Sequence, residues 1–511
     1  MKGSEMVTKF HNMEEYINIL SDAGILLENG CYDDTVKKIV RYISFDSQDI
    51  RYNTLFICKG AHFKREYLKD ALDEGAFAYI SETKYDNVDL NTPYIIVSDI
   101  RKAMILIADL YYNKVWENLT VIGITGTKGK STTTYFLKYI IDEYMKDIGR
   151  PESAVISGID NYDGIIKEES HLTTPEAMDL YKHFDNAVSS GIKFLSMEVS
   201  SQALKYDRVS EIIFDVGCFL NIGEDHISDI EHPDFEDYLA AKMKLFDKCR
   251  CACINMEDEY GNMAFERAAK SRLIEKNISF GRREGVDIMG YEIVPYERGI
   301  RFKVKCDSFD EKFVIGMRGL FNVDNALAAI AASYAMNIPI EHIKAGLKKA
   351  RVSGRMEIFN GKDGRTVIVD YAHNKMSFES LFKSMRSEFP CKKVTIVFGC
   401  PGYKALGRRK ELGSLAGEYT DKVYITEEDA GEEPVMKISK EIAGYVSAYD
   451  TRYEILTDRQ EAITKAIEEA DADTVVLITG KGRETRQKRV TQYIDTPSDV
   501  QIVEALLDVK E

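Results

Sequence analysis

Short apolar runs alternate with amphipathic segments along most of the chain, a pattern that is typical of α/β proteins. The apolar residues 119–124 predict a buried strand, and residues 132–141 predict the helix that follows it. Between them, Gly126 and Gly129 allow a tight turn. Further strands are predicted at 54–60, 76–80, 94–97, 192–199, 214–221, 251–254, 366–369, 393–398, 422–425 and 474–478.

The turn between the first of these strands and its helix carries the clearest chemistry. A strand, a glycine-rich turn and a helix N-terminus direct several backbone N–H groups at one anion. Lys130 adds a mobile positive charge, and the hydroxyl of Ser131 is suited to Mg²⁺. Gly123 lies one position further back than in the commonest phosphate loop. The alternative is a glycine-rich turn of an ordinary α/β unit, but Gly-Lys-Ser between a strand and a helix favours a bound nucleoside triphosphate.

The length of 511 residues predicts about three domains. Residues 1–110 form a small α/β unit that by itself indicates no chemistry. Residues 111–345 begin with the phosphate loop and form a parallel sheet. Residues 346–511 alternate strands with helices and predict a doubly wound domain.

Polar residues follow the strands of the second unit. Glu198 ends one strand, and Asp225 and His226 follow another, so a parallel sheet would bring them to the phosphates held by Lys130. Carboxylate and imidazole suit a divalent cation bound to phosphate, although a lone His is more often structural. Lys242 lies on an amphipathic helix, where a lysine extending from the helix face is an equal alternative.

Charged and polar loops also follow the strands of the third unit, as expected of a substrate-binding face. The acidic run 427–433 has two readings that the pattern leaves open, a solvated surface turn and a pocket for a cation. The loops carry Ser353-Gly354-Arg355, Asp370-Tyr371-Ala372-His373, Gly407 to Lys410, and Gly480-Lys481-Gly482-Arg483-Glu484.

Composition narrows the partners. A net charge of −16 and a pI near 5.2 argue against a nucleic-acid or anionic-membrane partner. No apolar run approaches transmembrane length, and the N-terminus lacks an apolar signal core, so we expect a cytoplasmic protein. The nine cysteines indicate no disulfide framework, and the cluster at Cys249, Cys251 and Cys253 fits a buried strand better than a zinc site.

Six motifs in order resemble the Mur ligase family of ATP-dependent amide-bond ligases of peptidoglycan synthesis. Within that family the chain is similar to the ligases that add the third amino acid to UDP-N-acetylmuramoyl-L-alanyl-D-glutamate. The likeness covers nearly the whole chain. The motifs are GTKGKSTTT at 126–134, LTTPE at 172–176, MEVSSQ at 197–202, NIGEDH at 221–226, SGRME at 353–357 and DYAH at 370–373.

The resemblance implies an N-terminal domain that holds UDP, a central ATP-binding domain and a C-terminal domain that brings the amino acid. It implies ATP and Mg²⁺ as cofactors, and we expect a monomer. The catalytic residues would be Lys130, His226, Lys242, Arg355 and His373, with Lys242 carbamylated. The ATP ligands would be Gly126, Thr127, Lys128, Gly129, Lys130, Ser131, Thr132, Asn325, Arg355 and Asp370. The metal ligands would be Ser131, Glu198, His226 and Lys242. The UDP-substrate ligands would be Ser47, Thr173, Thr174, Ser200 and Arg208.

The acidic run also suggests which amino acid is added. Family members that add meso-diaminopimelate carry Asp-Asn-Pro-Arg there, and the arginine grips the distal carboxylate. Here that arginine is missing, and an acidic loop suits a distal ammonium, so we expect L-lysine. The alternatives are the same reaction with meso-diaminopimelate or another diamino acid, and a related Mur-type amide ligase with a different acceptor. The expected amino-acid ligands are Lys404, Glu428, Asp429, Gly480 and Glu484.

Overall fold

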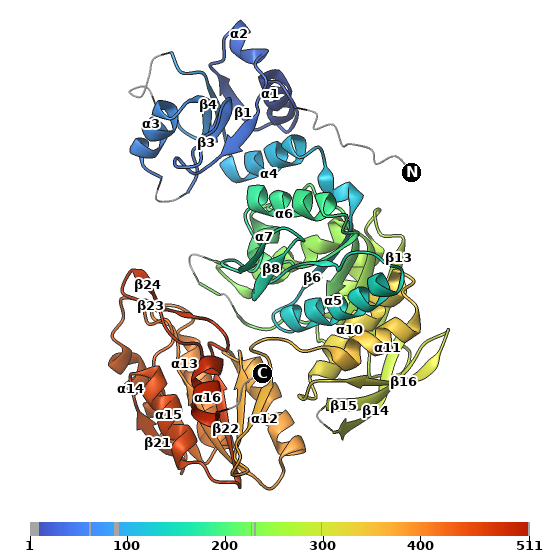
Figure 1. The fold of residues 1–511 in the computed structure, drawn as a ribbon, viewed down its shortest axis with the longest axis vertical. Helices are drawn as coiled ribbons and strands as arrows, with labels where there is room; N and C mark the ends of the chain where they lie inside the picture. The colour runs from blue at the N-terminus through green and yellow to red at the C-terminus, as the bar shows by residue number, and fades with distance from the viewer. Residues whose placement is uncertain are drawn as a thin grey trace.

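The computed structural model describes residues 10–60, 63–85, 91–225, 227–228, 231–297 and 299–508. Figure 1 shows three bodies in a row, in chain order from the N-terminal part at one end to the C-terminal part at the other. Each body is built around its own sheet, so the predicted α/β architecture is confirmed. Among the described residues, no helix is long and apolar enough to cross a membrane.

The first sheet has five strands in the order β1-β5-β4-β3-β2, and β2 to β5 are parallel. Its helices α1 and α4 cover one core, whereas α3 packs on a smaller core at the other face. The elements are α1 (Met13–Asp22), β1 (Leu26–Asn29), α2 (Asp33–Val36), β2 (Tyr42–Ser44), β3 (Thr54–Ile57), α3 (Arg65–Asp73), β4 (Ala76–Ser81), β5 (Tyr94–Val97) and α4 (Ile100–Tyr111).

The second sheet is the largest, and its parallel centre runs β13-β12-β11-β6-β10-β7. The strands are β6 (Thr120–Thr125), β7 (Ala154–Ile156), β8 (Asp160–Tyr162), β9 (Lys167–Glu169), β10 (Phe194–Glu198), β11 (Phe214–Phe219), β12 (Cys249–Asn255), β13 (Lys276–Gly281), β14 (Ile288–Tyr296), β15 (Gly299–Lys305) and β16 (Asp310–Ile315). The strands β8–β9 and β14–β16 extend its two edges with antiparallel pairs.

Helices cover both faces of this sheet and give it two apolar cores. On one face lie α5 (Lys130–Asp147), α10 (Asn322–Ala335) and α11 (Ile340–Lys349). On the other lie α6 (Ala177–Ser189), α8 (Phe235–Met243) and α9 (Gly261–Ala269), with the short α7 (Ser201–Lys205) after β10. The domain boundaries predicted near 110 and 345 fall within α4 and α11, and they stay predictions.

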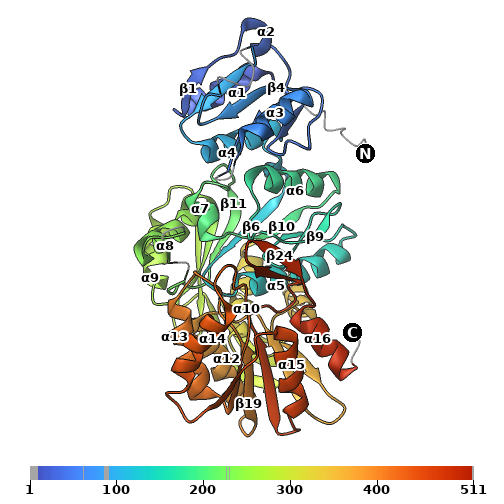
Figure 2. The same ribbon diagram turned by 90° about the vertical axis from the view of Figure 1, so that its left-hand side faces the viewer.

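The third sheet has the order β17-β18-β22-β19-β20-β21, and its strands are parallel except β17. Helices cover both faces, as the doubly wound pattern predicted (Figure 2). The elements are β17 (Glu357–Asn360), β18 (Thr366–Asp370), α12 (Lys375–Glu388), β19 (Lys393–Phe398), α13 (Gly407–Tyr419), β20 (Lys422–Ile425), α14 (Val435–Val446), β21 (Arg452–Ile455), α15 (Arg459–Glu469), β22 (Thr474–Thr479) and α16 (Asp499–Leu507).

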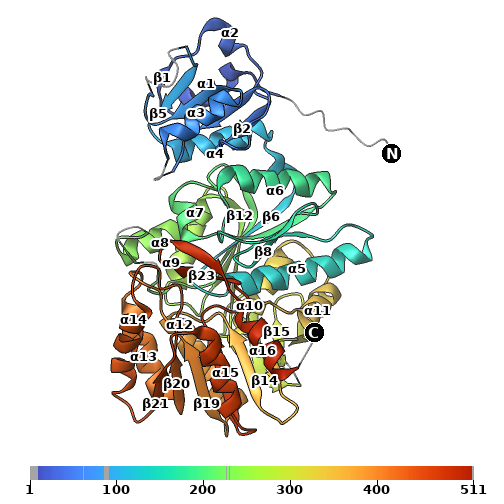
Figure 3. The same cartoon turned by 60° about the vertical axis from the view of Figure 1, so that its left-hand side comes forward.

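A hairpin of β23 (Arg486–Arg489) and β24 (Gln492–Asp495) leaves the third body and reaches the second. Figure 3 shows it lying between the C-terminal helices and the central sheet. Thr485 Oγ1 donates to Glu169 at 3.2 Å, and Arg486 lies 2.6 Å from the ring nitrogen Nδ1 of His171. The hairpin therefore adds a contact between the second and third bodies.

Candidate active site

The phosphate loop joins β6 to α5, as the pattern predicted. Gly129 has a φ of +79°, and a Cβ placed on it would meet Oδ1 of Asn325 at 2.1 Å, so only glycine fits there. Asn221, at the end of β11, brackets the loop, because its side chain accepts from the N–H of Lys128 at 2.9 Å and donates to the carbonyl of Lys128 at 3.1 Å. The side chain that follows β11 therefore holds the loop through both backbone groups of Lys128.

Two lysine ammonium groups converge on one carbonyl of this loop. Lys130 Nζ and Lys242 Nζ each donate to the carbonyl oxygen of Gly126 at 2.9 Å. Among the described residues, neither ammonium has a carboxylate within ion-pair distance. Burial lowers the pKa of Lys130, and burial together with the charge of Lys130 lowers the pKa of Lys242 well below its ordinary value. Lys130 therefore lies beside the phosphate-binding turn without a carboxylate partner among the described residues, which suits an anionic ligand.

Lys242 is 1% exposed, so it is not a lysine that extends from the helix into solvent. Its Nζ lies 4.6 Å from the ring centre of Tyr238, one turn earlier on α8. The Tyr238 hydroxyl is in turn 3.0 Å from Oγ1 of Thr127 in the phosphate loop. The helix therefore holds its lysine directly beneath the loop.

The residues predicted to hold a metal lie around the same point, except His226, which lies outside the described residues. Glu198 is 2% exposed at the end of β10, and its Oε1 accepts from the N–H of Gly158 at 2.7 Å. Ser131 opens α5 and is 7% exposed. In the part of the chain that the structure describes, no three His, Cys, Asp or Glu side chains form a metal cluster. A cation here would therefore need oxygens from its phosphate ligand as well.

The third body reaches the phosphate loop through Arg355, whose Nη2 donates to Oγ of Ser131 at 3.3 Å. Asp370, at the end of β18, accepts from the backbone N–H groups of Met356 and Ala372 at 2.9 and 2.8 Å. These bonds fix the turn that carries Arg355. Burial raises the pKa of Asp370, and the neighbouring Arg355 opposes that rise.

Asp225 makes a second contact between these two bodies. It accepts from Arg408 Nη2 at 2.5 Å and from Asn374 Nδ2 at 2.6 Å. His373 lies beside this contact, and its Nδ1 donates to the carbonyl of Tyr371, 2.8 Å away. Burial and the charge of Arg408 lower the pKa of His373 to about 3, so the ring is neutral at pH 7 and its Nδ1 carries the proton.

One cavity of ≈ 210 Å³, which we call the phosphate-side cavity, unites the lysines with the polar residues of two motifs. Thr174 donates to the carbonyl of Glu198 at 3.0 Å and receives the N–H of Ser200 at 3.0 Å. Arg208 donates to the carbonyl of Thr174 at 3.2 Å and pairs with Glu176 at 2.8 Å. The lining residues include Lys130, Lys242, Thr173, Thr174, Ser200 and Arg208.

A further cavity of ≈ 770 Å³ lies between the first and second bodies. Lys59, which follows β3, pairs there with Glu176 at 3.0 Å, so the two bodies are joined by an ion pair at its wall. Ser47 follows the neighbouring strand β2 and is not among the described residues that line this cavity. Its predicted role toward uridine stays a prediction.

All five residues predicted to hold the amino acid line one cavity of ≈ 640 Å³ in the third body, which we call the acidic-loop cavity. Glu427 and Glu428 are 6% and 8% exposed, so the run 427–433 is not a solvated surface turn. Arg489 of the hairpin pairs with Glu427 at 2.5 Å, and Lys481 pairs with Asp429 at 3.1 Å. The cavity contains the predicted residues Lys404, Glu428, Asp429, Gly480 and Glu484.

Glu428 differs from its neighbours in this loop. Among the described residues it has no ion-pair partner, whereas Glu433 pairs with the buried Arg409 at 2.6 Å. Burial raises the pKa of Glu428 to about 7, against the opposing charges of Arg459, Arg408 and Lys481. A buried carboxylate that faces a cavity without a bound cation suits a ligand that carries one.

Several residues of the site have no counterpart among the predicted ligands. Asn221 and Tyr238 hold the phosphate loop, Arg408 closes the two bodies together, and Arg489 neutralises Glu427. The signal for Arg408 was present in the charged loop at 407–410. The signal for Arg489 was not, because its hairpin is too polar to predict as strands.

Known proteins resemble the chain over its second and third bodies and beyond. A family model described as the Mur ligase middle domain matches residues 124–333, and one described as the glutamate ligase domain of Mur ligases matches residues 354–482. UDP-N-acetylmuramyl-tripeptide synthetase of Lactobacillus delbrueckii subsp. bulgaricus is 35% identical over 510 residues, which is 95% of this chain and 96% of the relative.

The L-lysine ligase for UDP-N-acetylmuramoyl-L-alanyl-D-glutamate from Enterococcus faecalis is 36% identical over 487 residues, 94% of each chain. Among solved structures, a ligase for UDP-N-acetylmuramoyl-L-alanyl-D-glutamate and 2,6-diaminopimelate aligns with a TM-score of 0.66 at 23% identity, over 98% of this chain and 99% of that one. The MurF ligase of Thermotoga maritima in complex with ADP aligns with a TM-score of 0.62 at 18% identity, over 92% and 97%. These two structures bear on the fold alone.

Proposed function

The chain belongs to the Mur ligase family, and we propose that it is the ATP-dependent ligase that adds the third amino acid to UDP-N-acetylmuramoyl-L-alanyl-D-glutamate. The observation that carries this proposal is the phosphate-side cavity. It unites Lys130 of the phosphate loop with Thr173, Thr174 and Ser200, so an acceptor carboxylate held by these hydroxyls would lie beside the terminal phosphate of ATP.

The proposed reaction proceeds through an acyl phosphate. An oxygen of the D-glutamate side-chain carboxylate attacks the γ-phosphorus of ATP, the bond to the β–γ bridging oxygen breaks, and ADP leaves. The amine of the incoming amino acid then attacks the acyl carbon, and inorganic phosphate leaves as the amide forms. Lys130 and the loop amides offset the repulsion between the two anions in the first step. Arg355 would add its charge to the nucleotide when the third body is closed on the second.

We propose Mg²⁺ as the resident cation, with Ser131, Glu198 and the predicted His226 as ligands and a carbamylated Lys242 as a further one. The residues fit this role. Lys242 is buried and its pKa is lowered, which favours the neutral amine, the form that adds to CO₂ with release of one proton. The resulting carbamate would turn an ammonium into an oxygen ligand, and bound Mg²⁺ would supply charge neutralisation at the phosphates.

The carbamate has a direct test. Lys242→Ala should reduce turnover about 10²-fold, and short carboxylic acids should restore part of it by replacing the lost carboxylate. Full activity of the variant without added acid would contradict the role of Lys242.

The amino acid that we propose is L-lysine. Glu428 is the carboxylate of the acidic-loop cavity that lacks a cation among the described residues, and an ε-ammonium would supply it. Two relatives at 36% and 33% identity bear the name of the L-lysine ligase, which supports the same choice. We further propose a monomeric protein of the cytoplasm.

The test is ADP release by the purified protein with ATP, Mg²⁺, the UDP-muramoyl dipeptide and a panel of amino acids. Turnover with L-lysine and none with meso-diaminopimelate is the expected result. The reverse pattern would refute the argument from Glu428 and leave the ligase proposal standing. ADP release without any amino acid and without a peptide product would instead favour a nucleotide-driven switch.

A further inference from the structure

A row of contacts runs from the phosphate loop to the acidic loop, and Tyr371 is its centre. Tyr371 follows β18 directly, between Asp370 and the turn that leads to α12. The guanidinium of Arg355 lies over its ring, 4.2 Å from the ring centre. The same guanidinium donates to Ser131 of the phosphate loop at 3.3 Å.

The hydroxyl of Tyr371 lies on the side of the acidic loop, where we propose that the incoming amino acid binds. It donates to Oε1 of Glu484 at 2.5 Å, and Oε2 of Glu484 lies 2.5 Å from Nζ of Lys481. Lys481 in turn pairs with Asp429 of the acidic loop at 3.1 Å. Burial and the charge of Glu484 raise the pKa of Tyr371 well above its ordinary value, so the hydroxyl keeps its proton and remains a donor.

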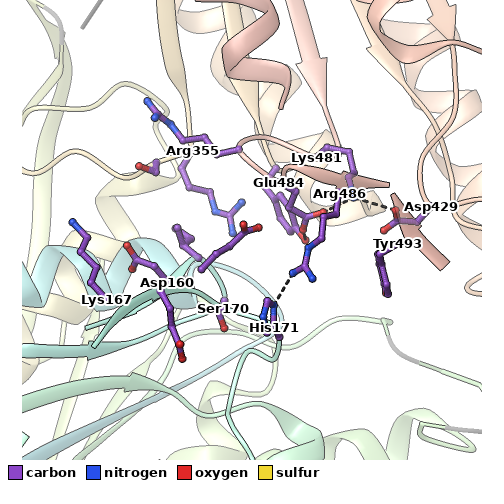
Figure 4. Close-up of a pocket in the computed structure, with 18 residues that line it drawn as sticks. Asp160, Lys167, Ser170, His171, Arg355, Asp429, Lys481, Glu484, Arg486 and Tyr493 are labelled. Carbon is purple, nitrogen blue, oxygen red and sulfur yellow. Dashed lines mark hydrogen bonds and ion pairs between the residues drawn. The ribbon is translucent and has the colours of Figure 1, made fainter. Parts of the chain in front are cut away.

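Tyr371 also separates two cavities. It lines the acidic-loop cavity and a neighbouring cavity of ≈ 660 Å³ between the second and third bodies. Figure 4 shows Arg355 at one side of this second cavity and Glu484, Lys481 and Asp429 together at the other. The ring and the hydroxyl therefore serve groups that belong to different substrates.

The two halves of the side chain make different physical contributions. The ring gives Arg355 a flat surface and a cation–π attraction, so the long side chain need not be ordered anew when the nucleotide binds. The hydroxyl holds one oxygen of Glu484 while Lys481 holds the other, and a carboxylate fixed at both oxygens has a single orientation. Without the hydroxyl, the carboxylate of Glu484 would keep its ion pair with Lys481 and lose its second fixed oxygen.

We propose that Tyr371 is a positioning residue for both substrates, with its ring holding Arg355 for the nucleotide and its hydroxyl orienting Glu484 for the incoming amino acid. This inference rests on the proposed ligase function. It assigns Tyr371 no contact with the reacting atoms.

The test separates ring from hydroxyl by measuring KM for ATP and for the amino acid in the full-length protein. Tyr371→Phe should raise KM for the amino acid about tenfold, because a hydrogen bond to a charged group is lost, and should leave KM for ATP within about twofold. Tyr371→Leu should raise both KM values. Tyr453→Phe is the control, because Tyr453 on β21 of the same body lines neither cavity, is 44% exposed and has no hydroxyl hydrogen bond within the described residues, so it should change neither KM.

A double variant guards against a purely structural effect. If the hydroxyl acts through Glu484, the double variant Tyr371→Phe with Glu484→Gln should raise KM no further than Glu484→Gln alone. Independent, additive effects would overturn the proposal, and so would equal rises of both KM values in Tyr371→Phe. Wild-type turnover is measured first. Absence of ADP release with every amino acid refutes the ligase function, whereas an active wild type with an unaltered Tyr371→Phe refutes the inference about Tyr371 alone.

Discussion

The phosphate-side cavity and the acidic-loop cavity hold buried charge in opposite ways. In the first, Lys130 and Lys242 share a carbonyl oxygen, and no carboxylate among the described residues pairs with either. In the second, Glu427 and Asp429 each have a cationic partner, and Glu428 has none within that part of the chain. The first site thus presents Lys130 as a cation without a carboxylate partner, which suits any polyphosphate. The second leaves a buried carboxylate, Glu428, without an ion-pair partner, which suits an ammonium at that position.

The difference teaches how affinity and specificity are divided in this protein. A polyphosphate carries several negative charges, so a site for it gains from every added cation. A site that must distinguish one amino acid from another gains specificity instead when its other charges are paired within the protein. Only the charge that contacts the ligand then remains unpaired. Three substitutions and one pH profile test this contrast, and they follow in order of expected effect.

The largest effect is expected where the surplus charge is removed. Lys130→Ala should lower kcat about 10³-fold, because the transferring phosphoryl group loses its nearest ammonium. Lys146→Ala, an exposed lysine near the end of the same helix, is the control and should behave as wild type. ADP release under saturating substrates measures the difference, and an active Lys130→Ala would mean that the loop amides alone stabilise the transfer.

The next effect is expected at the single uncompensated carboxylate. Glu428→Gln keeps the size of the side chain and removes its charge, so KM for L-lysine should rise about 30-fold and KM for ATP should stay unchanged. Glu468→Gln, an exposed carboxylate on α15 of the same body, supplies the control. An equal rise in both KM values would show that the variant disturbs the whole body rather than the recognition of an ammonium.

Glu428 also predicts how KM for L-lysine depends on pH. Burial raises the pKa of Glu428 to about 7, so the group is neutral below that value and charged above it. KM for L-lysine should therefore rise as the pH falls below about 7, by up to about tenfold per pH unit. In Glu428→Gln the profile should lose this step, and a step of the same size in the variant would assign the titration to another group.

The smallest effect is expected where a pair is partly exposed. Arg489→Gln frees Glu427, but Arg489 is half-exposed, so the pair is screened by solvent and contributes about 1 kcal/mol or less. KM for L-lysine should change less than about fivefold, and selectivity against meso-diaminopimelate should persist. A complete loss of selectivity would show that the hairpin, and not Glu428, reads the amino acid.

The sequence predicted the phosphate loop well because all of its parts are contiguous. The strand β6, the turn and the start of α5 lie within Thr120 to Ser131, and their apolar and glycine pattern is local. The strands β18, β19, β20 and β22 of the third sheet were predicted for the same reason, whereas its edge strands β17 and β21 were missed. The antiparallel strands β14–β16 and the hairpin β23–β24 were missed, since they alternate charged residues on exposed faces and offer no apolar run.

The acidic-loop cavity could be predicted only in part. Its five expected residues do surround one cavity, yet the neutralisation of Glu427 joins residues 62 positions apart and depends on a hairpin with no sequence signal. The role of Tyr371 was hidden for a related reason. Its contacts to Arg355 and Glu484 come from three loops that only the pairing of β17, β18 and β22 brings together.

The conformation of Gly129 limits which mutations could make the protein resistant to an inhibitor. Any side chain at this position would strain the backbone at a φ of +79° and collide with Asn325 at 2.1 Å. A compound that takes its hydrogen bonds from the backbone N–H groups of the loop, rather than from side chains, would meet a surface that mutation cannot reshape without removing the phosphate site. Resistance would then have to arise elsewhere in the molecule or by increased expression.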